Sequence, residues 1–199
     1  MKIVHISDTH GKHRELTNLP DADMIIHSGD FTFAGTDNEA IDFMDWYCDL
    51  PYMYKIFIAG NHDVCMLDAT IEGLPQNVYL LNNTGITVDG IKIYGVPMAV
   101  EYEISGENIE HINNIPIDSN IVVTHQPPYD ILDFSDNIKY GSKTLKDKIL
   151  SIKPMYHLFG HIHNSYGISN INGINFSNAA TVDEAYNITN SPRLITIDI

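Results

Sequence analysis

The chain has few cysteines and few positive charges. Cys48 and Cys65 are its two cysteines, too few for a disulfide framework, and their number favours a reducing compartment. Lysine and arginine together number 11 against 26 acidic residues, which gives a formal net charge of −15. A long nucleic acid or an anionic lipid surface is usually bound through a basic surface, so the sequence predicts neither as a partner. A small phosphorylated substrate stays open, because bound divalent cations would reverse the potential locally.

Long apolar runs are also missing. No stretch approaches the roughly 20 apolar residues that span a membrane. The opening run, residues 1–6, is too short to predict a signal peptide. With the shortage of cysteine, this predicts a cytoplasmic protein. A length of 199 residues and a hydrophobic fraction of 44% predict one domain with a full core over residues 1–199. The oligomeric state is left open.

What the sequence does contain is an alternation of β-branched runs with helical patterns. A capping box at Thr36 and Glu39 predicts the start of a helix that ends at Leu50. Asp89-Gly90 and Asn172-Gly173 predict two tight hairpins. Residues 99–120 carry the least pattern, and we expect a surface excursion there. The remaining expected elements are strands over 2–7, 23–28, 54–59, 121–124, 155–159 and 194–199, and a helix over 143–152.

Five short polar motifs follow these expected strands. They are Asp8-Thr9-His10, Gly29-Asp30, Gly60-Asn61-His62-Asp63, Thr124-His125 and Gly160-His161-Ile162-His163. In open α/β sheets, the carboxyl ends of the strands open into one crevice, where ligands bind. Motifs that are scattered over some 150 residues are therefore expected to converge in space.

The residue types in these motifs suit divalent metals. A carboxylate such as Asp30 can bridge two cations about 3.5–4 Å apart. Asp8 and His10 can face one metal only if the backbone twists sharply after the strand. Alternate residues of an extended segment point to opposite sides, so His161 and His163 can serve different metals.

The third motif combines a ligand with a proton donor. Asn61 offers a neutral amide oxygen, which is an unusual ligand. His62 can then contact a phosphate or protonate a leaving oxygen, and Asp63 is available to fix its tautomer. His13 and Arg14 follow the first motif closely enough to be candidate substrate contacts.

Each motif alone also has a purely structural explanation. Asp8 could form an Asx-turn, Gly60-Asn61 a hairpin-like turn, and His125 a buried core contact. All five motifs in one order are much harder to explain in this way.

In this order the motifs resemble the pattern of the calcineurin-like metallophosphoesterases, without substitution over residues 8 to 163. The resemblance implies an α/β fold with a two-sheet β-sandwich flanked by helices. It implies a first metal held by Asp8, His10, Asp30 and His163, and a second held by Asp30, Asn61, His125 and His161. His62 would contact the phosphate and assist the leaving group.

A narrower likeness points to the metallophosphoesterase-domain-containing branch, which is related to class III cyclic-nucleotide phosphodiesterases. This likeness rests on the segments 42–46, 50–52, 54–56, 58–62 and 178–181. Asn178, in the last segment, is therefore a third candidate substrate contact. Members hydrolyse cyclic nucleotides and other phosphodiesters, typically with manganese, and iron or zinc are the alternatives. The segment between Pro97 and His125 departs from the branch, because it is shorter and lacks a tryptophan-rich stretch.

Several functions remain open at this point. The first is a two-metal phosphodiesterase that uses a bridging hydroxide, and the second is a protein or small-molecule phosphomonoesterase. Ser/Thr phosphatase relatives carry an arginine shortly after the Gly-Asp motif, where this chain has Phe31-Thr32-Phe33. The third is a non-catalytic metal- or nucleotide-binding scaffold, although no ligand of the pattern is missing. A DNA-processing nuclease is a fourth, and the negative charge argues against it.

Overall fold

Parallel strands form the centre of two facing sheets. The computed structural model describes residues 1–66, 69, 71–97 and 107–197. In the first sheet β1 to β4 run parallel, and β13 pairs antiparallel with β1. In spatial order its strands are β13 (Arg193–Thr196), β1 (Lys2–Ile6), β2 (Met24–His27), β3 (Tyr54–Phe57) and β4 (Val78–Leu80).

The second sheet has a parallel centre of β12, β10, β7 and β6 with antiparallel strands at both edges. In spatial order its strands are β11 (Gly167–Ile171), β12 (Ile174–Asn178), β10 (Tyr156–Phe159), β7 (Ile121–Thr124), β6 (Ile91–Val96) and β5 (Thr84–Val88). A separate small hairpin consists of β8 (Phe134–Ser135) and β9 (Ile138–Lys139).

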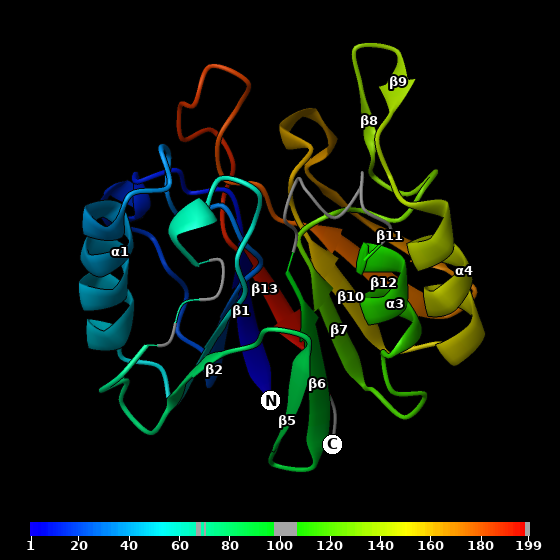
Figure 1. Cartoon of the computed structure of the whole chain (residues 1–199), viewed down its shortest axis with the longest axis horizontal. Helices are drawn as coiled ribbons and strands as arrows, with labels where there is room; N and C mark the ends of the chain where they lie inside the picture. Colours follow the sequence, from blue (N-terminus) through cyan, green and yellow to red (C-terminus); the bar gives the residue numbers. More distant parts are fainter. Residues whose placement is uncertain (67–68, 70, 98–106, 198–199) are drawn as a thin grey trace.

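Helices cover the outer faces of the two sheets. Helix α1 (Asp37–Asp49) lies on the first sheet, and α3 (Glu107–Asn113) and α4 (Lys143–Ile152) lie on the second (Figure 1). Successive side chains of a strand point to opposite faces. Ile3 of β1 therefore packs between the sheets, and Val4 packs toward α1. Two sheets between outer helices, in one compact domain, confirm the predicted fold class.

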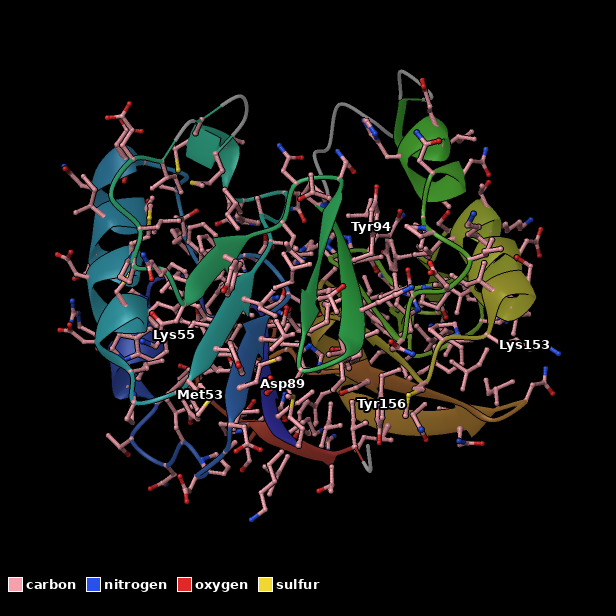
Figure 2. All side chains as sticks on the ribbon, turned by 90° about the horizontal axis from the view of Figure 1, so that it is seen from below. Met53, Lys55, Asp89, Tyr94, Lys153 and Tyr156 are labelled. Carbon is pink, nitrogen blue, oxygen red and sulfur yellow. The ribbon has the colours of Figure 1, made fainter. Side chains whose placement is uncertain are left out.

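The strand directions determine where a site can form. The parallel strands of both sheets end on the same side of the molecule as the β8–β9 hairpin (Figure 1). Figure 2 looks at the opposite side, where Met53 precedes β3, Asp89 lies in the β5–β6 turn and Tyr156 opens β10. All five polar motifs follow the carboxyl ends and so lie together.

Local signals explain most element boundaries. Thr36 accepts a hydrogen bond from Glu39 N, and the Glu39 carboxylate accepts one from Thr36 N, so the predicted capping box is present. Asn172 and Gly173, at φ 55° and 83°, form the predicted tight turn, as do Asp89 and Gly90 at 47° and 82°. Cys48 and Cys65 are free and half-buried.

Two predictions about elements need correction. Residues 99–120 are not only a surface excursion, because α3 forms there and Ile112 and Ile115 are buried against the second sheet. Residues 98–106 lie outside the described part. Strand β4 and the β8–β9 hairpin were not predicted. The expected last strand ends at Thr196 in the structure, and residues 198–199 lie outside the described part.

Candidate metal centre

Four of the candidate ligands have a left-handed backbone conformation. Asp8, His10, Asp30 and His161 have φ values of 52°, 43°, 58° and 69°. Non-glycine residues rarely adopt this region, at a cost of about 1–2 kcal/mol each. The conformation provides the sharp twist that the Asp8-x-His10 spacing requires, because it breaks the alternation of the strand and turns both side chains toward one centre.

One group of ligands gathers at the end of β1. Asp8, His10 and His163 bring one ligand atom each within 4.8 Å of one another. His163 Nε2 lies 3.5 Å from Asp8 Oδ1 and 3.4 Å from His10 Nε2. Two of these residues come from the first sheet and one from the second, so the site joins both sheets.

A second group gathers around Asp30. Asp30, His125 and His161 satisfy the same 4.8 Å criterion. Asp30 Oδ2 lies 3.2 Å from His125 Nε2 and 3.7 Å from His10 Nε2, so this carboxylate stands between the two groups. His161 and His163 therefore belong to different groups, as their alternate spacing predicted.

Backbone carbonyls orient the histidine rings in a uniform way. Four of the rings direct Nδ1 to a carbonyl oxygen, with distances of 2.8–3.1 Å, and leave Nε2 for the centre. The pairs are His10 with Thr32, His62 with Phe33, His125 with Ser28 and His163 with Asp183. A hydrogen bond from Nδ1–H fixes the tautomer and frees the Nε2 lone pair for a metal or a proton.

Among the described residues, seven buried side-chain polar atoms have no hydrogen-bond partner, and two of them belong to candidate ligands. These two are Asn61 Oδ1 and His125 Nε2, and both belong to residues that the sequence analysis proposed for the second metal. An unsatisfied buried acceptor such as the Asn61 amide oxygen costs about 1–3 kcal/mol, which a bound cation would remove. Carboxylate, imidazole and amide donors suit manganese, iron or zinc. The residues present therefore fit a pair of divalent cations.

The charges of the cluster also favour bound cations. Burial would raise the pKa of Asp8, but His163, His125 and His10 hold it well below its usual range. Burial would lower the pKa of His125, but Asp30 and Asp8 raise it to about 10. In the metal-free protein, a proton on His125 therefore provides positive charge that partly balances the two carboxylates. Metal binding would displace it, since ligating histidines are neutral.

Asp63 does not contact His62 in the way the sequence analysis expected. Its carboxylate accepts hydrogen bonds from Asp30 N, Thr32 N and Gly60 N, each at 2.8 Å. The Phe33 carbonyl fixes the tautomer of His62 instead. Burial raises the pKa of Asp63 to about 7, the Asp30 carboxylate adds to this, and the amide hydrogen bonds oppose it. Asp63 therefore joins the loop of Asp30 to the loop of Asn61.

Glycines allow this close packing. A Cβ atom on Gly60 would collide with the carboxylate and backbone of Asp30, and one on Gly160 would collide with the carboxylate of Asp8. Only glycine leaves room for such an approach.

A comparison with known families agrees with this geometry. The family model described as calcineurin-like phosphoesterase matches residues 1–165. The chain belongs to the calcineurin-like phosphoesterases.

Several relatives resemble this phosphoesterase over almost its whole length. It is 32% identical to UPF0046 protein K07C11.7 of Caenorhabditis elegans, over 99% of this chain and 75% of the relative. It is 31% identical to metallophosphoesterase domain-containing protein 1 of Homo sapiens, over 98% of this chain and 71% of the relative. A crystal structure with 12% identity covers 99% of both chains at a TM-score of 0.65, which supports the fold.

The three candidate substrate contacts, His13, Arg14 and Asn178, do not face the site as we expected. His13 is buried against α1, 3.1 Å from the Asp42 carboxylate and beside Trp46. The Arg14 guanidinium pairs with Asp42 at 2.9 Å. Neither residue lines the cleft described next. Fully buried Asn178 donates to Ile162 O at 2.9 Å and so fastens the loop of His161 rather than facing substrate.

A cleft of about 240 Å³ opens over the candidate ligands. Its walls include residues that the sequence analysis missed: Ser135, Asp136, Tyr140, Glu184 and Tyr186. They come from the β8–β9 hairpin, from Tyr140 just after it, and from the loop between β12 and β13; the hairpin and this loop rise above the same end of the sheets (Figure 1). These segments carry no motif.

A helix that crosses a membrane must be both long and apolar. None of the helices in the described part of the chain meets both conditions.

Proposed function

We propose that the chain hydrolyses small phosphodiesters, such as cyclic nucleotides, with the help of two divalent cations, of which manganese is the first choice. Asp8, His10, Asp30 and His163 would hold one cation, and Asp30, Asn61, His125 and His161 the other. Two such cations neutralise phosphate charge and lower the pKa of a bound water. The proposal rests chiefly on the two adjacent groups of ligand atoms, with Asp30 between them.

His62 is the proposed proton donor. It lines the cleft, and its Nδ1 is occupied by the Phe33 carbonyl at 2.8 Å. One ring nitrogen of His62 lies in a group with His10 and Asp30, and because Nδ1 faces the Phe33 carbonyl, we assign this role to Nε2. A proton at Nε2 can therefore pass to the leaving oxygen of an ester bound in the cleft, the usual task of a histidine acid.

The charge of the cleft favours diesters over monoesters. A monoester carries nearly two negative charges near neutral pH and is best bound by a guanidinium in addition to the metals. Among the described residues that line the cleft there is no lysine or arginine, and Asp136 and Glu184 add negative charge. A diester carries one charge, which the metals and His62 could balance.

The test is a hydrolysis panel with the manganese-loaded protein. We expect a higher kcat/KM for bis-p-nitrophenyl phosphate than for p-nitrophenyl phosphate, and turnover of at least one cyclic nucleotide. Arg14→Ala is a matched control, because Arg14 pairs with Asp42 on α1 and should not alter the ratio. A monoester kcat/KM equal to or above the diester value would replace the proposal with a phosphomonoesterase. Metal binding without turnover of any ester would favour a scaffold.

A further inference from the structure

Tyr186 forms one wall of the cleft directly beside the candidate ligands. Its ring makes edge contacts with His10 and His163, at centroid distances of 4.9 and 5.7 Å. The His62 ring lies 6.4 Å away. Tyr186 thus touches members of the first ligand group and faces the proposed proton donor, although no motif includes it.

The loop that carries Tyr186 is built to hold this position. Tyr186 has φ 60°, a strained value for a bulky side chain. Its amide donates to Asp183 O at 2.9 Å, and the Asp183 carboxylate accepts from Ala185 N and Asn187 N, both at 2.9 Å. The same Asp183 carbonyl oxygen lies 3.1 Å from His163 Nδ1. One turn therefore orients a candidate metal ligand and an aromatic ring together.

Phe33 packs against Tyr186 beside the cleft. Its ring packs edge-on against Tyr186 at 5.0 Å and lies 6.4 Å from the His62 ring. Phe33 is 51% exposed, so a large apolar surface is open to solvent beside the cleft. Its carbonyl is the group that orients His62. A phenylalanine beside a catalytic site is expected to bury this surface when a ligand binds.

The rest of the cleft restricts the ligand's charge. Glu184 and Asp136 carry carboxylates at the cleft, and Lys139 of the nearby hairpin is paired with Asp130. A second anionic group on the ligand would meet like charge there, while a planar apolar group would meet Tyr186 and Phe33.

We propose that Tyr186 and Phe33 form a subsite for an uncharged aromatic group attached to the phosphorus centre. This inference rests on the proposed function, since it assumes that the phosphoryl group binds at the candidate metals. It makes Tyr186 and Phe33 specificity-determining residues, and it identifies the substrates as phosphoesters with a planar ring rather than alkyl esters or esters with a further charge.

Equilibrium binding tests the subsite without any need for turnover. Phenylphosphonate and methylphosphonate share the same phosphonate group and have no ester bond to hydrolyse. At mildly acidic pH both are close to monoanions, which matches the charge of a diester. Calorimetry with the manganese-loaded protein should show phenylphosphonate binding about tenfold more tightly, in line with the typical strength of aromatic contacts. Tyr186→Ala and Phe33→Ala should each reduce this ratio to about threefold or less, and Tyr186→Phe should restore it. If Tyr186→Ala does not fold, Tyr186→Leu replaces it, and the same reduction of the ratio is expected because the aromatic ring is lost.

Phe134→Ala is the matched control. Phe134 is 50% exposed, like Phe33, but whereas the Phe33 ring packs against Tyr186, Phe134 lies in β8 and is joined by hydrogen bonds to Ser165, so its loss should leave the ratio at about tenfold. Equal affinities for the two phosphonates in the wild type, failure of both to bind, or an equal loss of the ratio in Phe134→Ala would overturn the subsite. A tenfold ratio without diester turnover would sustain the subsite and reject the proposed hydrolysis. Diester turnover with equal affinities for the two phosphonates would support the proposed hydrolysis and reject the subsite.

Discussion

The side chains of the candidate centre depend on backbone groups for their orientation. Carbonyl oxygens hold the Nδ1 atoms of His10, His62, His125 and His163, and amides hold the Asp63 carboxylate. Ligand geometry is therefore fixed by the loops after the strands before any ion binds. Such preorganisation keeps Nε2 of each ring available and separates the ligands from the proton donor.

This division of roles can be tested with histidine variants. His62→Ala should keep a near-normal manganese content while kcat falls by roughly 10²–10⁴-fold, because a general acid is lost and no proposed ligand is removed. His161→Ala should lower the manganese content together with the activity. Metal analysis after gel filtration, combined with kcat on bis-p-nitrophenyl phosphate, measures both. If His62→Ala loses one metal and its remaining loaded fraction turns over normally, His62 is a ligand and not the acid.

The sequence could predict the candidate ligands but not the residues around them. Asp8, Asp30 and the histidines occur in spaced motifs after strands, and that spacing carries chemical information. Tyr186 and Glu184 lie in a loop whose shape depends on hydrogen bonds to Asp183, which no local pattern indicates. The contact of Asp63 with the Asp30 loop was missed for the same reason, because proximity in sequence favoured His62.

At the scale of elements, patterns with a strong local cause predicted the structure best. Buried β-branched runs, Asp-Gly and Asn-Gly turns and the capping box of α1 all fix the backbone locally. Strand β4 and the β8–β9 hairpin are only three and two residues long per strand, too short for a periodic signal. Helix α3 has seven residues and depends on burial of Ile112 against the second sheet.

The start of α1 affects the site through Glu39. Its carboxylate caps the helix at Thr36 and also accepts from Phe33 N at 3.1 Å, and the Phe33 carbonyl orients His62. We expect Glu39→Ala to lower the free energy of unfolding by about 1–2 kcal/mol and kcat by about tenfold, because His62 loses its fixed position.

Thr36→Ala is the control for this effect. It removes the hydroxyl that caps Glu39 N but leaves the Glu39–Phe33 hydrogen bond, so it should lower the unfolding free energy by about 1 kcal/mol with little change in kcat. Urea titrations and kcat measurements on both variants provide the comparison. Equal kcat values for the two variants would mean that the cap does not act on His62.

At the scale of the whole molecule, each apolar layer contains a fully buried histidine. His5 lies between the sheets, with ring nitrogens 3.0 and 2.9 Å from the hydroxyls of Ser177 and Ser28. His27 packs against Phe43 under α1, and His157 packs against Phe159 under the outer helices of the second sheet. All three are fully buried, and burial lowers the pKa of each to about 3.

Because of these histidines, we expect acid to weaken the fold at pH values well above those at which Asp8 and Asp30 take up protons. Below pH 6.5 the unfolded chain binds protons that the folded chain does not, so stability falls as pH decreases from 6.5 toward 3. The loss approaches about 1.4 kcal/mol per pH unit for each histidine. The pKa values of Asp8 and Asp30 are lowered, so their stabilisation is lost only below about pH 4. Asp63, with its pKa raised to about 7, binds its proton first in the folded chain and offsets about one histidine between pH 7 and 4. The pKa of His125, raised to about 10, affects the metal-free chain only above pH 6.5.

His157→Gln isolates one of these contributions. Thr124 Oγ1 lies 2.9 Å from His157 Nε2 and also donates to Gln126 O at 2.6 Å, so a glutamine amide can replace the ring as donor. Urea unfolding of the metal-free protein between pH 6.5 and 4.5 should give a shallower decline for the variant, by up to about 1.4 kcal/mol per pH unit. At pH 7.5 this proton linkage is absent, so any difference there reports packing alone. Parallel declines in the two proteins would mean that His157 takes up a proton in the folded state, and burial could not then be the source of the acid sensitivity.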